Sequence, residues 1–201
     1  MKEPTIMYHD KSPFIAYYEN VLNEEECKEL IDLAKGILKP SAVVGDSKKS
    51  FSSARKSEHA WLHHNINENV LHISERIASI VGQPLNYAEK LQIVRYQPGG
   101  KFNTHLDTFQ SSGKLGREYL LKGGQRTYTA LLYLNSVDAG GETFFPALSL
   151  DITPIQGNLL VFENFSKETN QVHLLSKHGS RPLIAGEKWI ATLWFREKPQ
   201  Y

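Results

Sequence analysis

Two segments in the first half of the chain repeat apolar residues at the spacing of one helix face. Residues 23–38 begin with Asn23 as a candidate N-cap, and three glutamates follow at the positive end of the helix dipole. Residues 67–82 begin with Asn67 and end at Gly82, a typical helix stop. The pattern predicts two helices that each pack one face against other structure. The apolar positions are Cys27, Leu30, Ile31, Ala34, Ile37 and Leu38, then Val70, Ile73, Ile77 and Ile80.

From Leu91 onward the pattern changes to short β-rich runs that Gly, Pro, Asn and Asp residues separate. Such runs are typical of the many short strands of a sandwich or barrel. Helices followed by strands favour an α+β fold in which the helices cover one face of a sheet. The predicted strands are Leu91–Tyr96, Thr127–Leu134, Glu142–Phe145, Asn158–Phe162 and Lys188–Phe195.

Two polar stretches interrupt this pattern. Residues 45–55 are rich in Ser and Lys, and residues 108–125 contain four glycines. Loops of this length in a compact domain are often lids or substrate loops. We therefore expect both stretches to be mobile and to close over a substrate.

Composition adds limits to this picture. A length of 201 residues suits one domain, with residues 1–90 as a helical support region and residues 91–198 as the core. The 23 basic and 22 acidic residues nearly balance, which gives no general attraction to nucleic acid or to anionic membranes. The chain lacks a secretory signal and any apolar run near the roughly 18 residues of a membrane span, so we expect a soluble, cytoplasmic protein. The single cysteine, Cys27, excludes an intrachain disulfide, and nothing in the pattern predicts an oligomeric state.

A histidine and an aspartate two positions apart are the first candidates for chemistry. In an extended backbone His105 and Asp107 point to the same face, where they could supply two adjacent ligands to a metal. The fold would have to bring a third ligand, either His173 or His178. Two imidazoles and one carboxylate on one face of an octahedral metal leave three positions for a chelating cosubstrate and O2, as in non-haem Fe(II) oxygenases. The same ligands with a water molecule would suit a zinc hydrolase.

A lysine on the last predicted strand helps to choose between these metals. Lys188 follows His178 by ten residues, and a buried ammonium needs an anionic partner. The distal carboxylate of 2-oxoglutarate would be such a partner, and the hydroxyl groups of Tyr96 and Thr129 on neighbouring strands could complete its pocket. A zinc hydrolase would not need this anion pocket, and would usually place a carboxylate general base near its water.

Together these motifs resemble the catalytic domain of prolyl 4-hydroxylases. The motifs are HxD, GGET at residues 140–143, and a histidine followed after ten residues by lysine and then tryptophan. The resemblance extends from about Pro13 to Arg196, and because many relatives in the wider superfamily have arginine at the place of Lys188, the lysine narrows it to this group. It implies a double-stranded β-helix, or jelly roll, with N-terminal helices packed on one sheet. It also implies Fe(II), 2-oxoglutarate and O2 as the reacting partners, and ascorbate as an aid to turnover.

The resemblance implies a role for individual residues. His105, Asp107 and His178 would bind iron, and Lys188 would pair with the far carboxylate of 2-oxoglutarate. His173 would be structural. The cosubstrate would also accept hydrogen bonds from Tyr96 and Thr129.

The resemblance also places several residues at the peptide groove of the family. Glu89, Trp194 and Arg55 match this part of the pattern, and Phe102 stands where some relatives have tyrosine. No substrate arginine is assigned in the stretch between Asp107 and Thr129.

The implied reaction is hydroxylation of prolyl residues at the 4-position in a peptide or protein, with release of succinate and CO2. An aliphatic C–H bond is not acidic enough for general-base chemistry, so the reaction requires a strong oxidant. The same chemistry could act on free proline, another side chain or a nucleobase, although the balanced charge argues against nucleic acid. A zinc hydrolase and a peptide-binding module without turnover are the alternatives from other classes.

Overall fold

The computed structural model describes residues 5–8, 13–41, 43, 44, 49, 50 and 55–201. Its larger sheet has eight strands, and each neighbouring pair is antiparallel. In spatial order the strands are β1 (Thr5–Tyr8), β2 (Ile15–Tyr18), β14 (Leu159–Glu163), β10 (Arg126–Tyr133), β19 (Lys188–Arg196), β8 (Leu91–Tyr96), β7 (Glu58–Leu62) and β3 (Lys39–Pro40).

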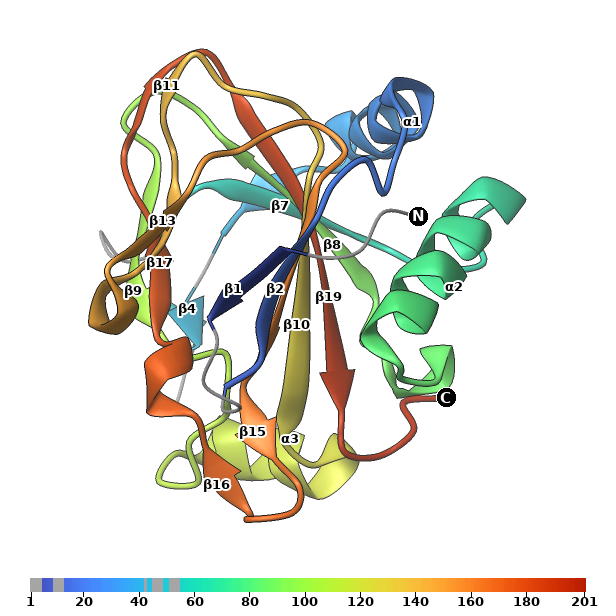
Figure 1. Cartoon of the computed structure of the whole chain (residues 1–201). Coiled ribbons are helices and arrows are strands. Elements are labelled where there is room, and N and C mark those ends of the chain that lie inside the picture. Colours follow the sequence, from blue (N-terminus) through green and yellow to red (C-terminus); the bar gives the residue numbers. More distant parts are fainter. Residues whose placement is uncertain (1–4, 9–12, 42, 45–48, 51–54) are drawn as a thin grey trace.

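A second, five-stranded antiparallel sheet lies on the side of the larger sheet that faces away from the two long helices (Figure 1). In spatial order its strands are β13 (Leu150–Ile152), β12 (Thr143–Phe145), β17 (His178–Ser180), β9 (Lys101–His105) and β6 (Arg55–Lys56). Three small pairs join β11 (Ala139–Gly140) to β18 (Leu183–Ala185), β15 (Phe165–Ser166) to β16 (Gln171–Val172), and β4 (Val43–Val44) to β5 (Lys49–Ser50).

The five strands that the sequence predicts are all present, and every boundary agrees within one residue. They form the centre of the larger sheet and one strand of the smaller sheet. In β19 every residue is buried, because both faces of this strand are covered. A strand that is buried on both faces has a nearly continuous apolar sequence, which explains the apolar run of β19.

The alternation of side chains along the central strands divides the core into two layers. On β10, Ala130 and Leu132 belong to the cluster on the helix side of the sheet, whereas Leu131 and Tyr133 belong to the cluster between the two sheets. This is the two-residue period of a β-strand. The inner layer, between the sheets, is the one that contains the polar side chains described below.

Two long helices lie on the outer side of the larger sheet (Figure 1). The helix α1 (Glu24–Lys35) begins with a capping box between Asn23 and Glu26, and α2 (Glu68–Val81) has Asn67 as its N-cap and Gly82 as its C-cap. Their buried side chains share one cluster with residues of β7, β8, β10 and β19. The remaining helices are α3 (Lys114–Gly123) and three short 3-10 turns, η1 (Leu85–Tyr87), η2 (Pro146–Leu148) and η3 (Leu174–Ser176).

The first predicted helix is shorter than its apolar pattern suggested. It ends at Lys35 because Gly36 forms its C-cap, and the chain then turns toward β3. Ile37, which the pattern placed on the buried face, is therefore 50% exposed. Of the predicted apolar positions within the observed helix, Cys27, Leu30 and Ala34 are fully buried, and Ile31 is partly buried against the same cluster.

The region before residue 91 contains strands as well as the two predicted helices. The strand β2 pairs with β14 and β7 pairs with β8, so this region forms part of the larger sheet. The interpretation of residues 1–90 as a helical support omits these strands. Within the described part of the chain, each helix is too short or too polar to cross a lipid bilayer.

A glycine fastens the N-terminal segment to the core, and its replacement should destabilise the protein. Gly157 has φ +79°, and its carbonyl accepts hydrogen bonds from the amides of Val21 and Leu22 at 2.8 and 3.0 Å. An added Cβ would lie 2.3 Å from the carbonyl oxygen of Leu22. We expect Gly157→Ala to lower the free energy of unfolding by about 2–4 kcal/mol in urea denaturation, from strain and steric overlap.

The control for this prediction is Gly36→Ala. Gly36 has φ −78°, and no atom of the described residues lies within 4 Å of a Cβ added there. This change should leave stability within about 1 kcal/mol of the wild type. Equal stabilities of the two variants would contradict the role of Gly157.

The glycine-rich stretch 108–125 contains a helix and is not an irregular loop throughout, which corrects the prediction. α3 occupies most of it, and the side chain of Gln125 accepts from the amide of Phe109 and donates to its carbonyl at 2.7 and 2.9 Å. Gly116 permits close packing, because a Cβ there would meet the carbonyl oxygen of Gln110. The glycines thus serve packing and helix termination. Most of the other predicted loop, residues 45–55, lies outside the described residues.

Candidate active site

A cavity between the two sheets brings together the inward-facing side chains of seven strands. β8, β10 and β19 contribute from the larger sheet, and β6, β9, β12 and β17 contribute from the smaller sheet. Asp107, two residues after the end of β9, completes the lining. Every second residue of β19 faces this cavity, in agreement with the alternation of a strand. On that strand the lining residues are Lys188, Ile190, Thr192 and Trp194.

His105, Asp107 and His178 form the only group of potential metal ligands among the described residues. One ligand atom of each lies within 4.8 Å of the others. His178 begins β17 directly opposite His105, the last residue of β9, so the register of the smaller sheet joins the two imidazoles. His105 Nε2 lies 3.3 Å from Asp107 Oδ1, and His178 Nε2 lies 3.9 Å from Asp107 Oδ2.

Backbone contacts orient both imidazoles. The Nδ1 atoms of His105 and His178 each lie 2.9 Å from a backbone carbonyl, that of Asn103 and that of Ser176 respectively. With the proton on Nδ1, the lone pair of each Nε2 is free to bind a metal beside Asp107. Metal-bound histidines use this arrangement. Burial lowers the pKa of His178 to about 4, so this imidazole is neutral near pH 7 and able to coordinate a cation.

Asp107 is held by two donors from the larger sheet. The hydroxyl of Thr129 and the indole N–H of Trp194 both donate to Oδ2, at 2.7 and 2.8 Å. Thr129 and Trp194 are opposite each other in the β10–β19 pairing, which places both donors on one oxygen. Burial alone would raise the pKa of Asp107, but the attraction of His178, His105 and Arg126 outweighs it and holds the pKa well below its usual range. The carboxylate is therefore ionised, as a metal ligand must be.

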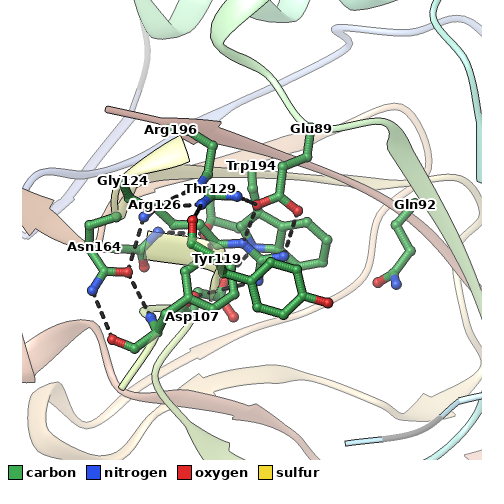
Figure 2. A network of polar contacts seen from close by, with 12 residues as sticks. Glu89, Gln92, Asp107, Tyr119, Gly124, Arg126, Thr129, Asn164, Trp194 and Arg196 are labelled. Atoms are coloured by element: carbon green, nitrogen blue, oxygen red, sulfur yellow. Dashed lines mark hydrogen bonds and ion pairs between the residues drawn. The ribbon is translucent and has the colours of Figure 1, made fainter. Parts of the chain in front are cut away.

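The other candidate ligand lies elsewhere. His173 Nε2 is 3.2 Å from a carboxylate oxygen of Glu163 and belongs to no ligand group. The two imidazoles and one carboxylate that do converge fit an iron(II) ion that keeps open positions, and they would equally fit zinc. Figure 2 shows how Thr129, Trp194 and Asp107 lie together in this network.

Lys188 lies in the same cavity and is 1% exposed. Its Nζ donates to the carbonyl of Gly141 at 2.6 Å and to the hydroxyl of Ser180 at 3.1 Å, which are neutral groups. Burial lowers its pKa to about 7, although the attraction of Glu142 opposes this. A buried ammonium whose hydrogen bonds go to neutral groups is a ready site for an anion.

Tyr96 and Thr143 stand beside this lysine. Tyr96 is buried and lies opposite Lys188 in the β8–β19 pair. Its hydroxyl is hydrogen-bonded to the side chain of Ser57, and burial raises the pKa of the phenol. Thr143, which the sequence did not point to as a site residue, also lines the cavity, and its hydroxyl accepts from the phenol of Tyr133 at 2.9 Å. Its position in the GGET motif, on a predicted strand, was the available signal.

Outside this cavity a wider hollow, the outer groove, opens to the surface. It shares Arg55, Asp107 and Trp194 with the cavity and extends past Glu89 and Trp61. The guanidinium of Arg55 donates to Ser57 Oγ at 3.0 Å and lies 4.7 Å from the ring of Phe102. The ring of Phe102 in turn stacks on His105 at 3.7 Å. Glu89, Trp194 and Arg55, the predicted groove residues, therefore all line one surface.

The carboxylate of Glu89 is held by two arginines that the sequence analysis missed (Figure 2). Arg126 binds both carboxylate oxygens at 2.8 and 2.7 Å, and Arg196 binds one of them at 3.0 Å. The guanidinium of Arg126 also lies 3.8 Å from the ring of Trp194. Burial alone would raise the pKa of Glu89, but Arg126 and Arg196 outweigh it and lower the pKa.

Breaking this network should cost stability and change its pH dependence. We expect Glu89→Gln to reduce the free energy of unfolding by about 3 kcal/mol near pH 7, because two buried guanidiniums lose their charged partner. A lowered folded pKa contributes stability that is complete above the ordinary value of 4.5 and is lost as the pH falls through the folded value. The variant should therefore lose stability less steeply below pH 4.5 than the wild type does in urea denaturation.

The matched control is Asp151→Asn. Arg181 binds Asp151 with the same two-bond geometry, at 2.7 and 2.9 Å, but both side chains are about half exposed. Exposed pairs contribute roughly 0–1 kcal/mol, so this variant should be almost as stable as the wild type. An equal loss in both variants would show that burial does not determine the contribution of Glu89.

The sequence of this chain is similar to those of known prolyl 4-hydroxylases. Residues 91–196 match the model of the 2OG-Fe(II) oxygenase superfamily. The "Putative prolyl 4-hydroxylase" of Acanthamoeba polyphaga mimivirus is 38% identical over 186 residues, which cover 92% of this chain and 74% of that protein. Prolyl 4-hydroxylase 13 of Arabidopsis thaliana is 34% identical, with 96% of this chain and 75% of that protein covered.

Solved structures share the fold. The viral collagen prolyl hydroxylase of Paramecium bursaria Chlorella virus-1, in its 2-oxoglutarate complex, is 26% identical and superposes with a TM-score of 0.71 over 90% of this chain and 95% of its own. A Trichoplax adhaerens prolyl hydroxylase in complex with a hypoxia inducible factor peptide fragment, at 20% identity, has a TM-score of 0.65, with 91% of this chain and 83% of that chain covered. At that identity the second likeness concerns the fold alone.

Proposed function

Because this chain belongs to the prolyl 4-hydroxylase family of 2-oxoglutarate- and Fe(II)-dependent oxygenases, we propose that it hydroxylates prolyl residues of peptides or proteins at the 4-position and releases succinate and CO2. The observation that carries the proposal is the placement of His105, Asp107 and His178 in one cavity with the buried ammonium of Lys188. This is the pairing that a metal-chelating dicarboxylate cosubstrate requires.

One end of the cavity holds the metal ligands and the residues that orient them. His105, Asp107 and His178 would hold iron, which when bound couples decarboxylation of 2-oxoglutarate to oxidation of the C–H bond. Thr129 and Trp194 fix the orientation of the Asp107 carboxylate, and the hydroxyl of Thr129 also accepts from Asn164 at 2.7 Å. Because the hydroxyl of Thr129 donates its hydrogen bond to Asp107, Thr129 would affect the cosubstrate mainly by orienting this metal ligand.

The other end of the cavity would bind the far carboxylate of the cosubstrate. Lys188 supplies the positive charge there, and Tyr96 and Thr143 supply neighbouring hydroxyl groups. Surrounding apolar side chains such as Leu131 and Ile190 would exclude water from the reacting centre. Glu89, Arg55 and Trp194 would contact the peptide where the outer groove meets the cavity.

We also infer that the two sheets form the double-stranded β-helix of this family, with α1 and α2 packed on the larger sheet. A single catalytic domain over residues 1–201, a cytoplasmic location and a benefit from ascorbate stay predictions from the sequence.

The zinc hydrolase alternative finds less support. Among the described residues, the carboxylates that line the cavity and the outer groove are those of Asp107 and Glu89. The first belongs to the ligand group, and the second is engaged by two guanidiniums, so neither is free to serve as general base beside a metal-bound water. The open outer groove also suits a polymer better than free proline.

The test is succinate release by the purified protein with Fe(II), 2-oxoglutarate and O2, with and without a proline-rich peptide whose mass is read afterwards. Succinate that the peptide stimulates, together with one added oxygen on proline, is the expected result. Succinate without oxidised peptide would move the target to another substrate, and no succinate from iron-loaded protein would overturn the proposal.

A further inference from the structure

The outer groove carries an excess of positive charge. Among the described residues that line it, the carboxylates are Glu89 and Asp107. Both are engaged, Glu89 by two arginines and Asp107 by the ligand histidines. The cationic side chains along the same surface are Arg55, Lys90, Lys122, Arg126, Lys177 and Arg196.

The excess remains after the internal pairs are counted. The guanidiniums of Arg126 and Arg196 face the carboxylate of Glu89, and Arg126 also attracts the carboxylate of Asp107, so these four charges balance. Arg55 donates to uncharged groups, the hydroxyl of Ser57 and the more distant side-chain oxygen of Gln92. Among the described residues, Arg55 therefore adds a positive charge that the carboxylates of the lining do not balance.

The rim adds three exposed lysines from three separate elements. Lys90 precedes β8, Lys122 lies in α3, and Lys177 precedes β17. All three are exposed, so a ligand can approach them without displacing another part of the described chain. The three lysines are far apart in the sequence, and the fold brings them to the lining of one groove.

Between these charges the groove has an aromatic surface. Trp61 is 39% exposed, and its ring lies 6.0 Å from that of Trp194, which contacts the metal ligand Asp107. Aromatic grooves are the usual recognition surface for extended proline-containing peptides. The lining of the groove thus combines an aromatic surface for proline rings with cationic groups.

We propose that the substrate is an acidic peptide, in which aspartate or glutamate residues flank the target proline and lie against these cationic groups. This inference rests on the proposed function and names the class of peptide. Complementary charge speeds association and selects partners, and like charges exclude the wrong ones. The preference should therefore act on peptide binding and KM, and leave kcat almost unchanged.

The test uses three fluorescent peptides with one proline core and glutamate, glutamine or lysine at the flanking positions. Binding is measured by anisotropy with the Fe(II)- and 2-oxoglutarate-loaded protein in the absence of O2, so that no turnover occurs. We expect the glutamate peptide to bind about tenfold more tightly than the glutamine peptide at low salt, the lysine peptide to bind most weakly, and the differences to shrink at high salt. Equal affinities of the three peptides would overturn the proposal.

Charge reversal on the rim gives a second test. The double variant Lys90→Glu/Lys122→Glu should lose the preference for glutamate or transfer it to the lysine peptide. Lys114→Glu is the matched control, because Lys114 is exposed on α3 as Lys122 is but does not line the groove. If the control shifts the preference as much as the double variant, general charge and not the groove is responsible, and the proposal is wrong.

Hydroxylation of the same peptides in air separates this inference from the proposed function. Tight binding of the glutamate peptide without oxidation of proline would contradict the proposed function and leave the acidic preference standing. Oxidation of all three peptides with equal KM would support the proposed function and contradict the acidic preference. A phosphoserine peptide that binds tightly while glutamate binds no better than glutamine would also contradict it.

Discussion

An Asp107→Ala variant should retain its fold and lose turnover completely. Asp107 is the only carboxylate in the ligand group, so its loss removes the negative charge that the imidazole ligands cannot supply to a divalent ion. Changes to residues that merely orient a metal ligand cost about 10–100-fold, so removal of the ligand itself should exceed this range. Iron content after gel filtration and succinate release with peptide both report the effect, and each should fall to the background.

Two further variants make this prediction specific. Asp107→Asn keeps an oxygen for the donors Thr129 and Trp194, so it should fold as well as the wild type while binding iron poorly. His173→Ala removes an imidazole that lies outside the ligand group, beside Glu163, and should keep most of the activity. Turnover by Asp107→Ala, or its loss in His173→Ala alone, would refute the assignment of the ligands.

The sequence was most informative where a local pattern determines the geometry. The HxD spacing indicated that His105 and Asp107 share a face, and the apolar run from Lys188 indicated a buried strand with the lysine at its start. Both follow from the two-residue period of a strand. Local patterns left His173 and His178 open as the third ligand, and the resemblance to the family favoured His178. Its physical basis is the pairing of β17 with β9, which no local pattern contains.

The missed arginines show two different limits. Arg196 has the same parity along β19 as Trp194 and Lys188, so alternation alone could have placed it toward the site. Arg126 has the opposite parity to Thr129 on β10, yet both face the site, because the register shifts between Arg126 and Tyr128. Such an irregularity changes the face of the sheet to which a side chain points, and the sequence alone does not indicate where it occurs.

The stretch before β10 shows a third limit. Its four glycines suggested a loop, since glycine is unfavourable in the interior of a helix. The helix α3 forms there nonetheless, and Arg196 binds the carbonyl groups of Tyr119 and Gly124 at its C-terminal end. Tertiary contacts that satisfy the end of a helix can outweigh weak local propensity.

Replacement of Lys188 should separate cosubstrate binding from metal binding. A hydrogen bond to a charged group contributes about 1.5–3 kcal/mol, so we expect Lys188→Met to raise the KM for 2-oxoglutarate roughly 10–150-fold. Methionine retains most of the volume of this fully buried side chain, which limits the loss of packing. Iron affinity should change little, because Lys188 bonds Gly141 and Ser180 and none of the three ligands.

The conservative variant distinguishes charge from packing at this position. Lys188→Arg keeps the positive charge, so it should recover part of the 2-oxoglutarate affinity that Lys188→Met loses, even though the larger guanidinium fits the pocket less well. Saturating 2-oxoglutarate should restore kcat in Lys188→Met if the lysine only binds the cosubstrate. An unchanged KM for 2-oxoglutarate in Lys188→Met, measured by succinate release, would show that the anion is bound elsewhere, and the buried ammonium would then need another explanation.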